Sequence, residues 1–312
     1  AIARIVSLFF TRPQYTGFEI LDELQKELGT TVNVHRTLQT YRGYEYVLRA
    51  LFKLKKFKAV FQSCYYTPHH MAINAICKDL GIPTIEFQHG IINDLHPAYN
   101  VYGDALDQRF YPDYLFCFGE STKKQIESTA FIPVDNIVPV GHNYLDIVQS
   151  EVKAKSDSRR KDGRRRVVVT LQPLCEKELI DFIMKVAKEN QNDLFLLIRR
   201  PLEKVTPLSH IQLAENVRYE EESDFYQCLA FADVHLTVCS TCAMEALFLG
   251  IPNILVDVND LAQDLLGDIL TDRRFTKIIK SPEEYACAAK SVEDIDRSQT
   301  SHSVSDIFCS IH

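Results

Sequence analysis

The chain has 312 residues, 46% hydrophobic and 25% charged, which is the composition of a soluble globular enzyme and enough chain for two domains. Its net charge of -7 argues against general binding to nucleic acid, which needs a basic surface. The nine cysteines are scattered, which suits a reducing compartment. Cys239 and Cys242 form a CxxC pair, but no second pair stands at zinc-ligand spacing, so no metal site is expected. There is no signal peptide and no apolar run of roughly 18 residues, so we expect a cytoplasmic protein.

In the first half of the chain, apolar runs typical of strands alternate with amphipathic runs typical of helices. The predicted strands cover residues 5–10, 31–34, 58–62, 84–87, 114–118 and 137–140. The predicted helices cover residues 17–28, 44–54, 68–80 and 121–129, and a long polar and aromatic loop covers residues 91–110. Such alternation implies a parallel sheet with helices on both faces.

A polar, basic stretch at residues 151–166 interrupts the alternation, and we interpret it as a linker whose charge would also suit contact with a membrane surface. Beyond it, strands are predicted at 167–171, 194–198, 217–219, 234–238 and 253–256, and helices at 176–190, 224–231, 243–249 and 282–291. The predicted fold class is therefore α/β, with two Rossmann-like domains, residues 1–150 and 167–312, facing across a cleft. Ligands of such sheets bind at the carboxyl ends of the strands, so the cleft is the default site.

The clearest site signal lies in residues 234–256, where a buried strand, a polar turn, a helix and a second buried strand follow one another. The turn leaves the N–H groups of a helix N-terminus at the carboxyl end of a strand, which suits phosphate. Ser240 and Thr241 add hydroxyl donors, and Glu245 is placed to accept a hydrogen bond from a ribose hydroxyl. The alternative is a plain βαβ unit, in which Ser240 only caps the helix and Glu245 lies on a solvated face.

Three more polar groups follow predicted strands: Gln88-His89-Gly90, residues 141–146, and Arg199-Arg200-Pro201. Together with Ser240-Thr241, in this order and spacing, they resemble the two-domain GT-B glycosyltransferases. Within that group the pattern is most similar to bacterial capsule-type sialyl- and Kdo-transferases and to CDP-glycerol glycerophosphotransferases. The resemblance spans residues 58–257. It departs from the family at Arg200, where those enzymes have a histidine that contacts the donor phosphate; arginine can bind phosphate but cannot act as an acid near neutral pH.

The resemblance implies a transferase, without a cofactor, that moves a sugar or polyol phosphate from a nucleotide-activated donor to a capsule or lipopolysaccharide acceptor. Because no DxD motif is placed to hold a divalent metal at the diphosphate, the transferase is expected to be metal-independent. The donor would be CMP-, CDP- or UDP-linked, and the acceptor a saccharide or lipid-linked glycan, reached in the cytoplasm or at the inner face of the membrane. His89 is expected to take the acceptor's proton, with Asp94 and Glu120 as further candidates for catalysis. The expected nucleotide- and phosphate-binding residues are Gln172, Arg199, Arg200, Tyr219, Ser240, Thr241, Cys242 and Glu245. The expected acceptor-binding residues are Arg12, His96, Tyr99, His142 and Asp146.

Two alternatives stay open from the sequence. A nucleotide-sugar epimerase of the UDP-N-acetylglucosamine 2-epimerase kind shares the fold and the serine turn, but it needs more carboxylates in the cleft. A non-catalytic module of an assembly complex is favoured by the missing histidine of the His-Pro pair. An epimerase would turn over a nucleotide sugar without an acceptor, whereas a scaffold would bind no nucleotide well.

Overall fold

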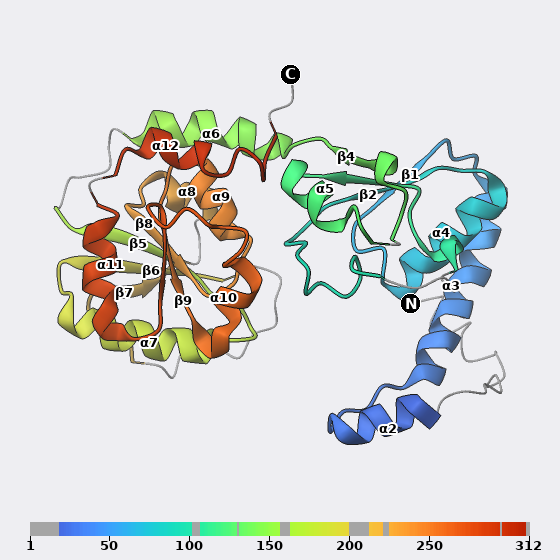
Figure 1. Cartoon of the computed structure of the whole chain (residues 1–312), viewed down its shortest axis with the longest axis horizontal. Coiled ribbons are helices and arrows are strands. Elements are labelled where there is room, and N and C mark those ends of the chain that lie inside the picture. Colours follow the sequence, from blue (N-terminus) through green and yellow to red (C-terminus); the bar gives the residue numbers. More distant parts are fainter. Residues whose placement is uncertain are drawn as a thin grey trace. The chain divides into compact units, whose positions relative to one another are not determined.

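The computed structural model describes residues 19–101, 107–129, 131–156, 163–199, 212–220, 225–293 and 295–309. The predicted strand at 5–10 lies outside these residues. The chain divides into two compact units (Figure 1): unit 1 is Ala1–His89, Pro97–Cys117 and Ile126–Val138, and unit 2 is Gly90–His96, Phe118–Gln125 and Pro139–His312. Each unit holds its own sheet with helices packed on it, so the predicted α/β class with two Rossmann-like units is confirmed.

The sheet of unit 1 has four strands in the order β1 (Val60–Gln62), β2 (Thr84–Phe87), β3 (Tyr114–Cys117) and β4 (Ile137–Pro139). Strand β2 pairs in parallel with both β1 and β3. Helix α4 (Pro68–Leu80) connects β1 to β2, and Gly81 closes it at a φ of 66°, a left-handed conformation that glycine adopts without strain. This connection is the strand–helix–strand unit that the sequence predicts for residues 58–87.

Helix α3 (Val34–Leu54) follows α2 (Glu19–Glu27) and begins earlier than predicted. The predicted strand at 31–34 is wrong, because Asn33 caps α3: its side-chain oxygen accepts a hydrogen bond from the Arg36 N–H at 2.9 Å. Although α3 has 21 residues, no helix within the described ranges is both long and apolar enough to cross a bilayer.

The sheet of unit 2 has six parallel strands: β5 (Arg165–Thr170), β6 (Asp193–Ile198), β7 (Val217–Tyr219), β8 (Val234–Thr237), β9 (Asn253–Val256) and β10 (Thr276–Ile279). Their spatial order is β10-β9-β8-β5-β6-β7. The chain runs outward from β5 to β7, returns to β8 on the other side of β5, and then runs outward to β10. The strands β5 and β8 therefore flank the topological switch point, where doubly wound sheets bind ligands.

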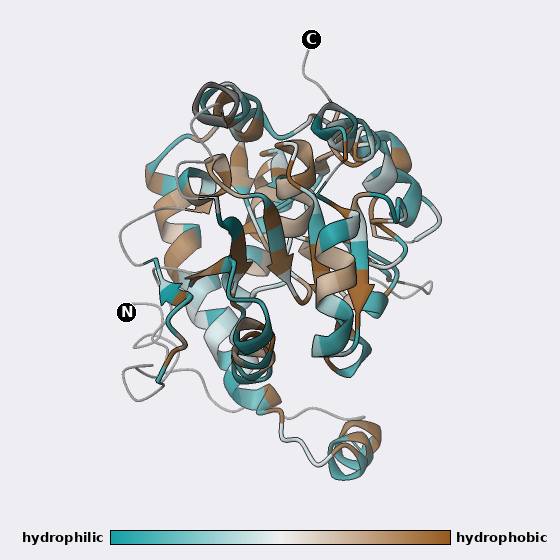
Figure 2. Ribbon diagram, turned by 90° about the vertical axis from the view of Figure 1, so that its left-hand side faces the viewer, coloured by the Kyte–Doolittle hydropathy of each residue, from teal (hydrophilic) through white to brown (hydrophobic). Residues whose placement is uncertain are grey.

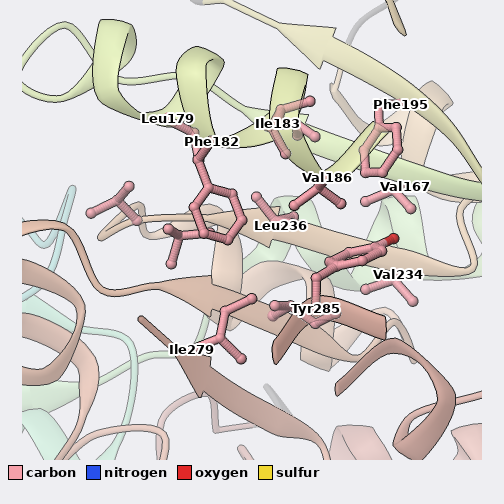
Figure 3. Packing of buried hydrophobic residues seen from close by; sticks show 14 of the residues in the cluster. Val167, Leu179, Phe182, Ile183, Val186, Phe195, Val234, Leu236, Ile279 and Tyr285 are labelled. Atoms are coloured by element: carbon pink, nitrogen blue, oxygen red, sulfur yellow. The ribbon is translucent and has the colours of Figure 1, made fainter. Parts of the chain in front are cut away.

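Helices cover both faces of this sheet. Helices α7 (Glu176–Glu189) and α11 (Tyr285–Ser291) pack on one face, where Figure 3 shows Phe182, Ile183 and Tyr285 against strand residues such as Val167 and Leu236. Helices α6 (Asn143–Ser156), α8 (Phe225–Ala230) and α9 (Cys242–Phe248) contribute to the core on the other face. Every residue of β6 is buried, as expected for a strand between two helical layers. In Figure 2 the strands are mostly brown, whereas the helices alternate between brown and teal.

Helix α6 occupies the start of the predicted linker. It runs through Ser156, and β5 begins at Arg165. Leu145, Val148 and Val152 of α6 stand at helical spacing and are buried in the cores of unit 2. The sequence analysis missed this helix, and it also missed α10 (Leu261–Leu266), β10 and α12 (Arg297–His302). The domain boundaries at residues 150 and 167 stay a prediction.

The C-terminal segment of unit 2 packs against the residues that follow β3. The Ser121 N–H donates to the Asp306 carbonyl at 2.9 Å, and the Cys309 N–H donates to the Phe118 carbonyl at 3.0 Å. Gly119 permits this approach, because a Cβ atom at that position would lie 2.5 Å from the carbonyl oxygen of Ile307.

We expect Gly119→Ala to lower the free energy of unfolding of unit 2 by about 1–3 kcal/mol, because the added methyl group would overlap a backbone oxygen held by its neighbours' hydrogen bonds. Thermal unfolding followed by circular dichroism measures the loss. Gly90→Ala is the matched control, since a Cβ atom there meets no atom within 4 Å. An unchanged melting temperature for Gly119→Ala would contradict the close packing of this segment.

Candidate functional site

Gln172 joins the two strands of the switch point in unit 2. It follows β5, and its Oε1 accepts a hydrogen bond from the Cys239 backbone N–H at 3.0 Å and from the Cys239 thiol at 3.4 Å. Cys239 opens the turn after β8. One residue predicted for the nucleotide site therefore fixes the turn that carries three others, Ser240, Thr241 and Cys242.

The turn at residues 240–242 presents backbone donors. The Cys242 N–H donates to Ser240 Oγ at 3.2 Å, whereas the N-cap position of α9 belongs to Thr241, whose side chain makes no capping hydrogen bond. The N–H groups of Ala243 and Met244 donate to the carbonyl oxygens of Ser240 and Thr241. The N–H groups of Ser240 and Thr241 make no hydrogen bond within the part of the chain that the structure describes. Two such neighbouring N–H groups can bind an anionic oxygen.

The charged residues predicted for this site already have partners in unit 2. Arg199, at the end of β6, forms a two-pronged ion pair with Glu176: its Nη2 lies 2.7 Å from Oε2, and its Nε contacts Oε1. Its guanidinium carbon also lies 5.9 Å from the ring centroid of Tyr219, whose pKa is raised to about 12 by burial. Glu245 accepts a hydrogen bond from the Tyr226 hydroxyl at 2.8 Å. A ligand would have to share Arg199 and Glu245 with these partners.

In unit 1, the strand-end His89 lies beside a cysteine. Its Nε2 is 3.0 Å from Cys64 Sγ and 3.4 Å from the Tyr66 hydroxyl. Cys64 follows β1 and has a φ of 55°, in the left-handed region that residues other than glycine rarely adopt. The parallel pairing of β1 with β2 brings both residues to the same edge of the sheet. His89 is exposed and Cys64 is half-buried.

Glu86, in β2, is a fully buried carboxyl close to this edge. Its Oε1 accepts hydrogen bonds from the Tyr65 N–H at 3.1 Å and from the Tyr99 hydroxyl at 2.9 Å. Burial raises the pKa of Glu86 to about 7, and these hydrogen bonds oppose the rise. The carboxyl therefore changes protonation near neutral pH while it holds the backbone that follows Cys64.

We expect the stability of unit 1 to fall as pH rises, in a way that Glu86→Gln abolishes. The pKa of Glu86 is about 7 in the fold against an ordinary value of 4.5, so the folded state binds more protons between these values and loses stability as pH rises through 7. The stability difference between wild type and Glu86→Gln should change by about 3 kcal/mol between about pH 4.5 and pH 8. Chemical denaturation across this range measures it. The exposed Glu127 of unit 1 gives the control Glu127→Gln, and equal pH slopes for wild type and Glu86→Gln would contradict the raised pKa.

The remaining predicted site residues are spread over both units. Tyr99 of unit 1 is fully buried with its hydroxyl on Glu86, so it offers no exposed surface to an acceptor. In unit 2, the His142 ring has its centroid 4.9 Å from that of Phe118 and 6.1 Å from that of Phe308. The exposed or half-buried members in unit 2 are Asp94, His96, Glu120 and Asp146. Arg12 and Arg200 lie outside the described residues. The catalytic and acceptor-binding roles of all these residues stay predictions.

The sequence analysis did not single out Cys64 and Tyr66. Their positions in the sequence could have revealed them, because they follow the predicted strand at 58–62 as His89 follows the predicted strand at 84–87. Consecutive parallel strands end at the same edge of a sheet, so residues that follow them lie close together. Among the residues that the structure describes, no three histidine, cysteine or acidic side chains gather in a group that could hold a metal ion.

Neither a family model nor a curated protein matches the sequence, but solved structures match the fold. The UDP-GlcNAc 2-epimerase of Neisseria meningitidis, bound to UDP-GlcNAc, aligns with a TM-score of 0.55 and 15% identity over 91% of this chain and 87% of that chain. The glycosyltransferase of kitacinnamycin aligns with a TM-score of 0.56 and 14% identity, over 96% of this chain and 80% of that chain. CalG4, the calicheamicin glycosyltransferase, aligns with a TM-score of 0.56 and 13% identity, over 96% and 79%. The fold is that of GT-B enzymes. At these identities the likeness is one of fold, shared by glycosyltransferases and epimerases alike.

Proposed function

We propose that this protein is a glycosyltransferase that binds a nucleotide sugar at the switch point of unit 2. The observation that carries the proposal is the hydrogen bond from Cys239 to Gln172. It fixes a turn whose Ser240 and Thr241 N–H groups have no partner within the described residues. Doubly wound sheets bind the phosphates of nucleotides at this position. Fixed donors that meet the leaving phosphate stabilise the charge that develops on it.

The second requirement of glycosyl transfer is a base that takes the proton of the acceptor hydroxyl. We assign this role to His89 of unit 1, because its imidazole is exposed at a strand end and histidine is a common general base. Asp94 and Glu120, which are also exposed, are the remaining candidates. The proposed chemistry uses backbone donors and side chains and needs no metal ion.

An epimerase is the second candidate, because the solved structures that share the fold include UDP-GlcNAc 2-epimerases. Such a reaction needs carboxylates that are available to the sugar. Three carboxylates near the strand ends of unit 2 are already engaged. Glu176 pairs with Arg199 at 2.7 Å, Glu245 accepts from Tyr226 at 2.8 Å, and Asp257 lies 3.3 Å from Lys280. These three carboxylates would have to leave their partners before they could serve an epimerase.

We expect the double variant Gln172→Ala with Thr241→Val to bind nucleotide at least roughly tenfold more weakly, because it loses the carbonyl that fixes the turn and one hydroxyl donor. Isothermal titration with CMP, CDP, UDP and GDP measures the affinity. Gln191→Ala is the matched control. Gln191 precedes β6 and so lies at the amino end of the strands of the same sheet, and among the described residues its side chain donates only to carbonyl oxygens of helix α7. Unchanged affinity in a folded double variant would show that the nucleotide binds elsewhere.

One assay separates the candidate functions. Each nucleotide sugar that binds is incubated in EDTA with and without a saccharide acceptor. A transferase consumes the donor rapidly only when the acceptor is present, an epimerase converts the donor alone, and a non-catalytic module does neither. Activity that disappears in EDTA and returns with magnesium or manganese would contradict the metal-independent mechanism.

We further propose that the donor is CMP-, CDP- or UDP-linked and that the acceptor belongs to a capsule or lipopolysaccharide, as in the sialyl-, Kdo- and CDP-glycerol-dependent enzymes that the sequence resembles. The order and spacing of the strand-end motifs support this choice, and the basic stretch at 151–166 suits an acceptor presented at the inner face of a membrane. A thermal-shift screen tests it, because a nucleotide at a hundred times its Kd stabilises its site by about 2.7 kcal/mol. Stabilisation by GDP alone would contradict the proposed donor class.

A further inference from the structure

The Cys64 sulfur lies among groups that carry protons. Its distance to His89 Nε2 is 3.0 Å, and the Tyr66 hydroxyl lies 3.4 Å from the same nitrogen. Burial raises the pKa of Tyr66 to about 12, and a hydrogen bond to Cys64 adds to the rise. A phenol and an imidazole therefore converge on one partly exposed thiol. The thiolate is the reactive form of cysteine, and an imidazole within hydrogen-bond distance can take the thiol proton.

The backbone fixes the position of this thiol. Cys64 has a φ of 55°. The N–H of the next residue, Tyr65, donates to the buried Glu86, and His70 Nδ1 lies 3.0 Å from the Cys64 carbonyl oxygen. Contacts on both sides of Cys64 hold the turn, so the folded chain presents the sulfur to His89 and an unfolded chain would not.

The other cysteines provide an internal comparison. Five of them are buried and therefore inaccessible to reagents in the folded chain: they are Cys77, Cys117, Cys175, Cys228 and Cys239. Cys287 is exposed on α11, and its thiol has no hydrogen bond or ion pair with any described residue. Cys287 therefore reports the reactivity of an accessible thiol without a histidine beside it.

We propose that Cys64 and His89 form a reactive thiol–imidazole pair that is modified by small electrophiles and by low-molecular-weight disulfides such as glutathione disulfide. The thiol proton passes to His89 Nε2, and the thiolate attacks one sulfur of the disulfide. A new S–S bond joins Cys64 to that half of the disulfide. The other half leaves as a thiolate and takes the proton from His89. The attached group then lies against the ring nitrogen of His89.

Site-resolved labelling of the native full chain tests the pair. Iodoacetamide is added in trace amounts, and the rate at each cysteine is read by peptide mass spectrometry. We expect Cys64 to react at least roughly tenfold faster than Cys287. His89→Gln should remove most of this advantage, and Tyr66→Phe should reduce it. His302→Gln, which alters an exposed histidine of α12, should leave it unchanged. Equal rates for Cys64 and Cys287 in the wild-type chain would overturn the proposal, as would a folded His89→Gln variant with an undiminished Cys64 rate.

Glutathione disulfide provides the second measurement. We expect the native chain to gain one glutathione, at Cys64, and to lose it on treatment with dithiothreitol; modification at Cys287 in preference to Cys64 would overturn the proposal. Neither experiment uses a donor or an acceptor, so both are independent of the proposed transfer reaction.

The consequence for turnover rests on the proposed function. Modification of Cys64 should stop transfer but spare nucleotide binding by unit 2, and turnover by Cys64→Ser should not respond to the disulfide.

Discussion

His89→Asn is expected to lower kcat roughly a hundredfold to ten-thousandfold, which is the usual contribution of a positioned general base. Asparagine keeps a polar side chain of similar reach but cannot take a proton from the acceptor hydroxyl. His89 is exposed, so the variant should keep its melting temperature. The donor should also bind with unchanged affinity, because the proposed nucleotide site lies in unit 2. The measurement is transfer by the purified enzyme with a donor identified in the nucleotide screen.

The other candidate bases give the comparison for this experiment. Asp94→Asn and Glu120→Gln remove the remaining carboxylates proposed for the role, and His302→Asn controls for the loss of a surface histidine. A large loss of kcat in Asp94→Asn or Glu120→Gln, with His89→Asn nearly fully active, would move the base to that carboxylate. If His89 only supported the turn at Cys64, the variant would instead lose stability by about 1 kcal/mol and keep most of its turnover.

Acidification from about pH 6.5 to about pH 4 is expected to cost unit 2 about 3 kcal/mol through His235 alone. His235 is fully buried in β8, and burial lowers its pKa to about 4. The unfolded chain therefore binds more protons than the folded chain between these two values, and stability is lost as pH falls through them. The neutral ring is well satisfied: Nδ1 donates to Asn253 Oδ1 at 2.8 Å, and the Thr170 hydroxyl donates to Nε2 at 3.0 Å. Protonation would add a hydrogen to Nε2, which would then face the hydrogen of the Thr170 hydroxyl.

His235→Gln tests this account because glutamine cannot titrate. Wild type should lose stability more steeply than the variant over this range, by about 3 kcal/mol in all. Native-state hydrogen exchange of the β8 amides measures the loss within unit 2. His302→Gln, at an exposed position in the same unit, should keep the wild-type pH dependence. A parallel pH dependence in wild type and His235→Gln would show that the buried ring contributes nothing to the acid response.

The sequence by itself determined the fold class and most elements of each unit, although it did not show α6, α10, α12 or β10. The alternation of apolar strands with amphipathic helices predicted two parallel sheets, because the spacing of apolar residues is a local property of the chain. It also placed His89, Gln172 and Ser240 just beyond strand ends, and in the structure they lie two or three residues beyond β2, β5 and β8. Where a local contact competed with propensity, the prediction failed: Asn33 caps α3 and turns the expected strand at 31–34 into the start of a helix.

Only the tertiary structure decided which strand ends meet. The crossover from β7 back to β8 brings Gln172 to Cys239, 67 residues further along the chain, and the pairing of β1 with β2 brings Cys64 to His89. The tertiary structure also decided the charge at the predicted phosphate site, because the fold pairs Arg199 with the carboxylate of Glu176. Strand order follows from how helices pack the connections onto a sheet. No local pattern encodes that packing, so the partners of strand-end residues become visible only in the fold.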